Sequence, residues 1–472
     1  MMRCMVLVLL LPLAVLGGCS MQPDYRRPES PVPPSWPTGD AYVRQSEAEL
    51  PGYSHAQVFG DPRLSVLIDQ ALANNQDVQL AVANIAAARA RYRIQRAELF
   101  PQVDVGATYR RSDADSSAAG ERDRFSADAS ITGYELDLFG RIRSLSLAER
   151  NRYFASEAAA RAVRLTLVAD IADAWLAHAA DSSLLGVAKR TAADARESMR
   201  LTNRRLQGGV APRSDVRQAE IVLRTAEADV AELTTAVAQD LNALQLLLGA
   251  PVDPALLSAS IEEAGSGLAE VPAGLNSSIL LRRPDVVEAE YELRAANAEI
   301  GAARAALFPR ITLTGLLGFA SNALGGLFDS GGFAWQAGAD ASYSIFSGGA
   351  ARADVALSKA QRDAALASYR KAVQSAFADV ANVLARRGTI DAQLTATAAR
   401  RDAAADNARL AGLRYRGGIE SYIEELTARQ ALYAAERALV QTRLVKAGNL
   451  VALYRALGGD PFTQRGIGDG GD

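Results

Sequence analysis

The chain has 472 residues and a formal net charge of −3, with acidic and basic residues interspersed along it. This pattern provides no basic patch for nucleic acid, and two cysteines and two histidines provide neither a disulfide framework nor a zinc site. Because no Gly-rich phosphate loop or catalytic-triad motif stands out, we expect no cofactor, no metal, no nucleic-acid partner and no enzymatic activity.

The N-terminus has the pattern of a bacterial export signal. Arg3 precedes an apolar stretch, residues 4–16, that is too short for a permanent membrane span. It ends in Leu16-Gly17-Gly18-Cys19, which resembles the lipobox that places acyl groups on a cysteine. We therefore expect removal of residues 1–18 and lipidation of Cys19. Ser20, rather than an aspartate, favours the outer membrane by the same resemblance. The alternative is an ordinary signal peptide with an incidental cysteine.

The rest of the chain is a duplication. Leu99-Phe100-Pro101 recurs as Leu307-Phe308-Pro309, 208 residues later, and much of the surrounding sequence repeats at a similar offset. A period this long indicates two copies of a whole module rather than a solenoid. The expected organisation is a lipidated extended segment (19–60), a first repeat (61–250), a connection (251–283), a second repeat (284–460) and a tail (461–472).

Each repeat contains an unusually long helical stretch. Residues 141–206 contain no proline and a single internal glycine, Gly186, so a continuous helix would be roughly 100 Å long. Residues 350–413 match it in the second repeat. Apolar and small residues recur at spacings of four and three, which is typical of a left-handed coiled coil. Such rods must pack against other helices because they cannot form a compact core alone.

Paired glycines follow each long helix. Gly208-Gly209 and Gly417-Gly418 can adopt the positive φ that ends a helix. After the first pair, Pro212 and the Ser214 hydroxyl are typical of the beginning of a new helix, with the hydroxyl as its cap. Each repeat therefore folds back as a helical hairpin. A plain helical turn without a function at its tip is the alternative.

Four segments alternate between apolar and polar residues with the two-residue period of a strand. About ten residues suffice for a tilted strand to cross a bilayer. Because four strands cannot close a barrel and open edges are not tolerated in lipid, the edges are expected to pair with other copies of the chain. The alternative is a soluble pair of hairpins that covers the helix ends. The predicted strands are at about 102–112, 124–138, 310–320 and 333–346.

Each predicted hairpin of strands ends in a distinctive segment: Tyr134-Glu135-Leu136-Asp137-Leu138-Phe139-Gly140-Arg141 in the first repeat and Tyr343-Ser344-Ile345-Phe346-Ser347-Gly348-Gly349 in the second. Together with the lipobox and the repeated Leu-Phe-Pro, these segments resemble the lipoprotein branch of the TolC-like outer membrane factors, the NodT family. The resemblance covers essentially the whole mature chain. It implies a mainly α fold with a membrane β part: a homotrimer with one shared 12-stranded outer-membrane β-barrel and a coiled-coil helical barrel that extends into the periplasm. Its implied function is the exit duct of a tripartite efflux pump or a type I secretion system, with a periplasmic adaptor and an inner-membrane pump as partners.

The family resemblance also implies a periplasmic gate at the hairpin tips. Asp215 and Tyr415 match an aspartate and a tyrosine that tie inner to outer helices, and Glu424 matches an acidic ring position. Thr427 stands where a second ring aspartate is usual, and Glu420 where a linking arginine is usual, so both depart from the family pattern. The alternatives are a carboxylate that favours a helix N-terminus for Asp215 and a solvated surface charge for Glu424.

A second class of function remains open at this point. A lipid-anchored periplasmic coiled-coil adaptor or scaffold would have no pore, but it would be expected to have one helical hairpin rather than two, and no amphipathic ten-residue strands. The sequence does not identify the exported substrate or the pump class.

Overall fold

The computed structural model describes residues 20–42, 58–112, 122–268, 277–329 and 331–459, so Cys19 and the C-terminal tail lie outside the described residues. The main helices are α3 (Pro62–Asn74), α4 (Gln76–Ala97), α5 (Arg141–Gln207), α6 (Arg213–Leu248), α7 (Ile261–Ser266), α8 (Pro284–Ala305), α9 (Ala350–Arg416) and α10 (Tyr422–Ala456). The strands are β1 (Asp104–Ser112), β2 (Arg122–Glu135), β3 (Arg310–Ser321) and β4 (Phe333–Ser342), and short 3-10 turns are η2 (Pro254–Leu256), η3 (Ser277–Arg282) and η4 (Leu324–Gly326).

The chain divides into two compact units. The strand unit comprises residues 1–29, 83–158 and 287–371, and the hairpin unit comprises residues 30–82, 159–286 and 372–472. Each unit therefore contains residues of both repeats. The first part of α5 and of α9 belongs to the strand unit, and the remainder of each helix belongs to the hairpin unit.

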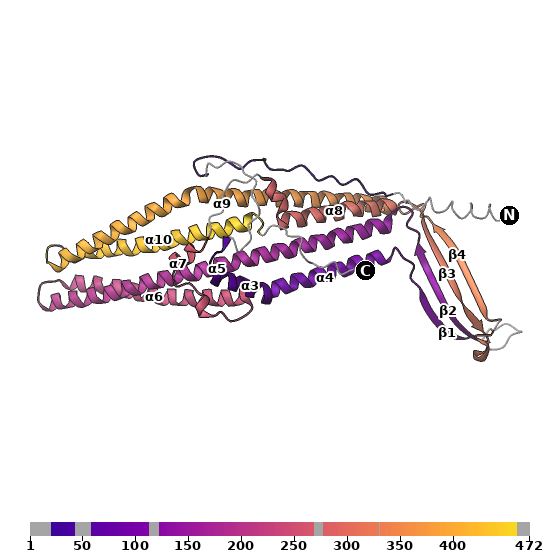
Figure 1. The fold of residues 1–472 in the computed structure, drawn as a ribbon, viewed down its shortest axis with the longest axis horizontal. Helices are drawn as coiled ribbons and strands as arrows, with labels where there is room; N and C mark the ends of the chain where they lie inside the picture. The colour runs from indigo at the N-terminus through magenta and orange to yellow at the C-terminus, as the bar shows by residue number, and fades with distance from the viewer. Residues whose placement is uncertain (1–19, 43–57, 113–121, 269–276, 330, 460–472) are drawn as a thin grey trace. The chain divides into compact units, whose positions relative to one another are not determined.

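The strand unit contains one antiparallel sheet in the order β1-β2-β3-β4 (Figure 1). The two repeats meet at its centre, where β2 pairs with β3; β1 and β4 are the outer strands. The prediction of a mainly helical chain with four strands is therefore confirmed. One side of β1 and one side of β4 have no strand partner within the described chain.

Two strands end earlier than the alternation of their residues suggests. β2 stops at Glu135 because Asp137 turns away to cap α5, where its carboxylate accepts the backbone N–H groups of Ile142 (3.0 Å) and Arg143 (2.9 Å). β4 stops at Ser342, which pairs with Arg310. The residue before Arg310 is a proline, which has no N–H to continue the ladder.

The sheet leaves large apolar side chains uncovered. Val105 is 84 % exposed and Trp335 is 72 % exposed, while Thr108 and Ser126 hydrogen-bond to each other across the strands. A soluble protein rarely exposes an apolar surface of this kind. The strand unit therefore offers a surface suited to lipid.

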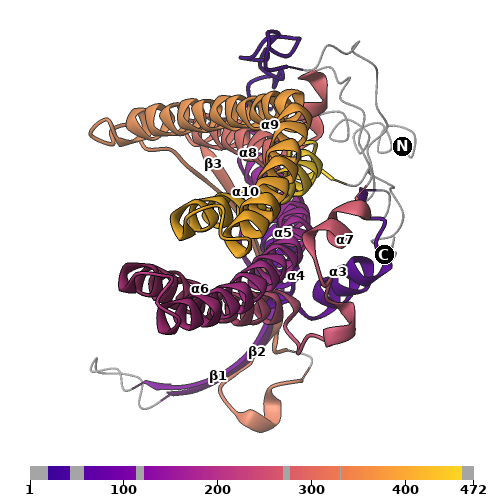
Figure 2. The same cartoon turned by 90° about the vertical axis from the view of Figure 1, so that its left-hand side faces the viewer.

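In the hairpin unit, α6 packs against the second half of α5, and α10 against the second half of α9 (Figure 2). Ala172, Trp175 and Ala179, which follow the predicted spacing of three and four residues along α5, are fully buried. The indole N–H of Trp175 donates to the carbonyl of Leu256 at 3.0 Å. Val216 and Leu223 of α6 are buried as the spacing predicts. Among the described residues, no helix is both long enough and apolar enough to cross a membrane.

The two hairpin turns use glycine as the sequence predicts. Gly209 has φ 74° and Gly418 has φ 73°, and both follow the last turn of a long helix. The predicted hydroxyl cap on α6 is wrong. Pro212 occupies the N-cap position without a side-chain hydrogen bond, and the Ser214 hydroxyl instead contacts the Asp215 carboxylate at 3.4 Å.

Residues close to the expected lipidation site are held on α8. Arg27 pairs with Glu290 at 2.6 Å, and Arg294 pairs with the other oxygen of Glu290 at 2.6 Å. Burial alone would raise the pKa of Glu290, but the two guanidinium groups outweigh it and lower that pKa. The segment that follows Cys19 is thus attached to the strand unit by an ion pair whose carboxylate is buried.

A carboxyl pair lies between α5 and α6. Asp240, which interrupts the apolar stripe of α6, faces Asp181, and one Asp240 carboxyl oxygen is buried without a hydrogen-bond partner. Burial and the neighbouring Asp181 raise the pKa of Asp240 to about 6. The nearby His178 is buried, which lowers its pKa.

We predict that Gly418→Val lowers the thermal stability of the purified protein, because a branched side chain at positive φ costs about 1–2 kcal/mol. Gly417→Ala is the matched control, since Gly417 does not have a positive φ. Equal losses for the two variants, measured by thermal unfolding, would contradict this role of Gly418.

The pKa of the Asp240 carboxyl is higher in the folded chain than in the unfolded one, so the protonated carboxyl favours the folded state at low pH. This contribution to the free energy of unfolding is lost as the pH rises through about 6. We therefore predict that Asp240→Asn melts at a higher temperature than the unmodified protein at pH 8, with the difference disappearing at pH 4. Glu232→Gln, an exposed change on the same helix, should show no such pH-dependent difference. An Asp240→Asn advantage that grows on acidification would refute the assignment.

Candidate functional site

The tips of the two hairpins are tied together around Tyr415, which is 2 % exposed. The Thr202 hydroxyl lies 3.3 Å from the Tyr415 hydroxyl, and because Thr202 donates to the carbonyl of Ser198 at 2.9 Å, Tyr415 is the donor of this contact. Arg205 donates to the Tyr415 carbonyl at 2.8 Å and places its guanidinium 4.5 Å from the ring centroid. Tyr415 of one repeat is therefore held by two residues of the other.

Tyr422 completes an apolar cluster at this point. Its ring lies 5.4 Å from that of Tyr415, and burial raises the pKa of its phenol. Away from this cluster, polar contacts also join the hairpins: the Tyr433 hydroxyl of α10 donates to the Asp229 carboxylate of α6 at 2.7 Å. The cluster comprises Ala219, Tyr415, Tyr422 and Leu426, with Met199, Leu201 and Val222 packed against it.

The other predicted gate residues are more exposed. Glu424 and Thr427 are exposed on α10, and Thr427 donates to the Ile423 carbonyl at 2.8 Å. Glu420 pairs with Arg414 at 2.6 Å within its own hairpin. Asp215 is half-buried, and its carboxylate accepts from the Ser214 hydroxyl at 3.4 Å. The carboxylate next to Glu424, that of Glu425, is 3 % exposed and pairs with Arg429 at 2.7 Å.

Sequence reasoning missed the partners of Tyr415. Arg205 and Arg414 each stand three residues before a pair of glycines, so the sequence treats them alike. In the structure Arg205 reaches the other hairpin, whereas Arg414 pairs within its own. Thr202 and Tyr422 had no motif to single them out.

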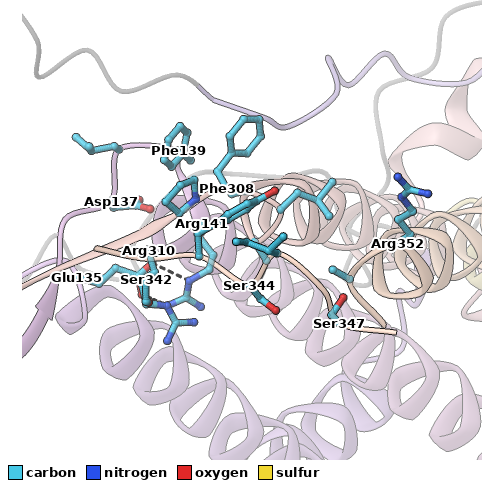
Figure 3. A pocket seen from close by; sticks show the side chains of 18 of the residues that line it. Glu135, Asp137, Phe139, Arg141, Phe308, Arg310, Ser342, Ser344, Ser347 and Arg352 are labelled. Carbon is cyan, nitrogen blue, oxygen red and sulfur yellow. Dashed lines mark hydrogen bonds and ion pairs between the residues drawn. The ribbon is translucent and has the colours of Figure 1, made fainter. Parts of the chain in front are cut away.

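A second site lies where strands become helices, within the strand unit. A cavity there has a volume of about 460 Å³. Glu135, Arg141 and Arg310 lie together among the side chains that line it (Figure 3). Glu135 receives hydrogen bonds from Arg141 at 2.9 and 2.8 Å and pairs with Arg310 at 3.2 Å. Phe139 stacks on Phe308 with centroids 4.7 Å apart and planes 18° apart. These contacts join the segment that leaves β2 to the segment that enters β3.

The described part of the chain contains no group of three or more acidic, histidine or cysteine side chains placed to hold a metal ion. Its two candidate sites consist instead of contacts between repeats, aromatic stacks and exposed carboxylates. An arrangement of this kind can hold the two hairpins together, release them when the contacts break, and expose negative charge at the tips.

We predict that Arg205→Ala speeds amide hydrogen exchange around residues 413–422 by roughly tenfold, because it removes a charge-assisted hydrogen bond to the Tyr415 carbonyl. Arg204→Ala removes the same charge from an exposed neighbouring position and should leave that exchange unchanged. Indistinguishable exchange in the two variants would show that Arg205 does not tie the tips.

Comparison with known proteins agrees with this architecture. The family described as "Outer membrane efflux protein" matches the chain twice, over residues 67–250 and 275–459. The toluene efflux pump outer membrane protein TtgC of Pseudomonas putida is 42 % identical over 459 residues, which is 96 % of this chain and 95 % of that protein. The outer membrane protein OprJ of Pseudomonas aeruginosa is 37 % identical over 449 residues, covering 94 % of this chain and 93 % of that protein.

Solved structures show the same fold. The open state of the MtrE outer membrane channel of Neisseria gonorrhoeae superposes with a TM-score of 0.84 at 35 % identity, covering 94 % of this chain and all of that one (100 %). The duplicated helical hairpins, the four-stranded sheet and these matches over nearly the whole length lead to one conclusion: this chain belongs to the outer membrane efflux protein family and is an outer-membrane channel component of the efflux type.

Proposed function

We propose that three copies of this chain form a passive duct through which an efflux pump exports small molecules across the periplasm and the outer membrane. The observation that carries the proposal is the open four-stranded sheet, whose apolar face is exposed and whose edge strands lack partners in the described chain. In lipid those edges need further strands, and three identical sheets would supply twelve.

The length of the helices supports a duct that continues beyond the membrane. α5 and α9 each have 67 residues, roughly 100 Å of helix, against about 30 Å for the hydrocarbon core of a bilayer. A ring of such helices from three copies would extend the lumen into the periplasm.

The hairpin tips are suited to act as a gate. The tie at the tips centres on Thr202, Arg205 and the Tyr415 cluster, and a partner protein that displaces these side chains would release it. Exposed Glu424 and half-buried Asp215 would each be present three times in the assembly. Converging carboxylates attract cations and repel one another, which suits a constriction that is closed at rest and can open.

The partners follow from the same proposal. A duct without chemistry of its own depends on an inner-membrane pump to select and drive the cargo, and on a periplasmic adaptor to join the two. The relative named for toluene efflux favours small apolar molecules as cargo. A type I secretion system would use a similar duct, but the relatives' names give it no support.

Lipidation of Cys19 would add an anchor. Several acyl chains bind a membrane firmly. The contact of Arg27 with buried Glu290 would carry that anchor to the strand unit within a few residues of the cysteine. The pore-free adaptor or scaffold is disfavoured, because it would not need an exposed apolar sheet.

We predict that the purified protein forms trimers that dissociate on heating and that conduct weakly, with cation preference, in planar bilayers. Glu424→Gln should raise the conductance and reduce the cation preference, because the carboxylates hold cations at the constriction. Glu232→Gln, also an exposed change, serves as the control.

A monomer without conductance in any of the three forms would refute the duct. In cells, deletion of the gene should increase susceptibility to apolar drugs or solvents, and the Glu232→Gln variant should restore resistance.

A further inference from the structure

Two arginines face each other in the first hairpin of strands. Arg110 of β1 lies directly opposite Arg124 of β2 in the register of the sheet, and both side chains are exposed. Directly opposite residues of an antiparallel pair share one face, with their Cβ atoms about 4.5–5.5 Å apart, and like charges at such positions destabilise the strand pair. The stability of the sheet therefore does not explain why two cations stand here.

No described carboxylate neutralises this arginine pair. Among the residues that the structure describes, neither guanidinium has an ion pair or a hydrogen bond. Asp123 accepts a hydrogen bond from the Tyr109 hydroxyl at 2.9 Å, and as the neighbour of Arg124 it lies on the opposite face of the strand. Asp128 shares the face of Arg124 but lies four residues further along β2, about 13 Å away in an extended strand. Both positive charges are thus available to an external anion.

The arginine pair lies on the polar face of its hairpin. Thr108 and Ser126 form the next opposite pair on that face, and their hydroxyls lie 2.6 Å apart in a hydrogen bond. The other face carries Tyr109, stacked on Phe125 with ring centroids 4.9 Å apart, and the exposed Val105. Membrane barrels turn their apolar face to lipid and their polar face to the lumen. In the proposed duct the arginines therefore face the lumen.

The arginine pair also lies at the end of the strands that is remote from the helices. α4 precedes the beginning of β1 and α5 follows the end of β2, so the end of β1 and the beginning of β2 lie together at the far end of the hairpin (Figure 1). Because the helices of the proposed duct extend into the periplasm, this far end opens to the outside of the cell.

The second hairpin of strands has no such pair. The offset of 208 residues between the repeats places Arg110 on Gly318, and Gly318 pairs with Ala334. A Cβ at Gly318 would lie 2.6 Å from the Cα of Asp128, so β2 leaves no room for a side chain there. The same sheet position is therefore small and neutral in one repeat and cationic in the other, which indicates that the fold does not require the arginines.

We propose that Arg110 and Arg124 bind multivalent oxyanions, such as the phosphate groups of a polyphosphate, on the luminal face at the outer end of the duct. A guanidinium presents planar N–H donors that match two oxygens of a phosphate, so two opposed guanidinium groups can hold one phosphate between them. Each arginine would recur three times around the opening, and rings of arginine favour anions. This inference rests on the proposed trimeric duct and gives its outer end a charge opposite to that of Glu424.

Titration calorimetry with sodium tripolyphosphate tests the site on the purified trimer in detergent, and it needs no open pore. We expect Arg110→Gln combined with Arg124→Gln to weaken binding roughly tenfold, because charge-assisted hydrogen bonds are lost. Arg111→Gln removes the same charge from the next residue of β1, which lies on the apolar face, and should leave the affinity unchanged. Equal affinity in the three forms, or no binding by the unmodified protein, would overturn the site.

Phosphate has two sources at this end of the sheet: an anion dissolved in the lumen, or the headgroup of a lipid outside it. Tripolyphosphate is not amphiphilic and probes the first source, and lipid A, a glycolipid with phosphate groups, probes the second. The double variant should retain as much lipid A through gel filtration as the unmodified trimer. Loss of lipid A from the double variant, but not from Arg111→Gln, would place the arginine pair on the lipid face and overturn the luminal assignment.

Ion selectivity separates this inference from the duct itself. In channels that carry Glu424→Gln, the further change of both arginines to glutamine should shift the reversal potential in a KCl gradient toward cation preference. A current with an unchanged reversal potential, together with no tripolyphosphate binding, would overturn the anion site and leave the duct intact. Binding that depends on the arginine pair, without any current, would support the anion site and overturn the duct.

Discussion

Backbone hydrogen bonding at the edges of one small sheet is the constraint on which this structure depends. β1 and β4 each present N–H and C=O groups on one side without a strand partner in the described chain. In water such an edge is a hazard for aggregation, but in a bilayer each unpaired group costs several kcal/mol. A chain of this family in the outer membrane must therefore obtain further strands, and in the proposed trimer identical copies would supply them.

The two repeats share one pattern of helices and strands, but their side-chain contacts differ at the sheet and at the hairpin tips. At the sheet, Glu135 pairs with Arg310 where β2 meets β3, whereas the neutral residues Ser344 and Gln102 occupy the corresponding positions in the other repeat. At the tips, Arg205 reaches across to Tyr415, whereas its counterpart Arg414 pairs with Glu420 nearby. The contact of Arg205 with the second hairpin therefore has no counterpart from Arg414.

Local periodicity was sufficient to predict most of the fold. Spacings of three and four residues predict α5 and α6, paired glycines predict the turns at Gly209 and Gly418, and alternation predicts four strands. Such local patterns do not predict contacts between residues that are far apart in the sequence. Arg205 and Tyr415 are 210 residues apart, and the use of Asp137 as a helix cap, which shortens β2, depends on the path of the chain after the strand. The family resemblance identified Tyr415, but not the residues that hold it.

Amide hydrogen exchange of the protein in lipid vesicles tests the central claim most directly, because it reports whether the backbone groups of the sheet edges are paired. The account predicts that the amides of β1 and β4 are protected to the same degree as those of β2 and β3, which have partners within the chain. Rapid exchange along β1 and β4 beside slow exchange along β2 and β3 would contradict it, because the edges would then face water.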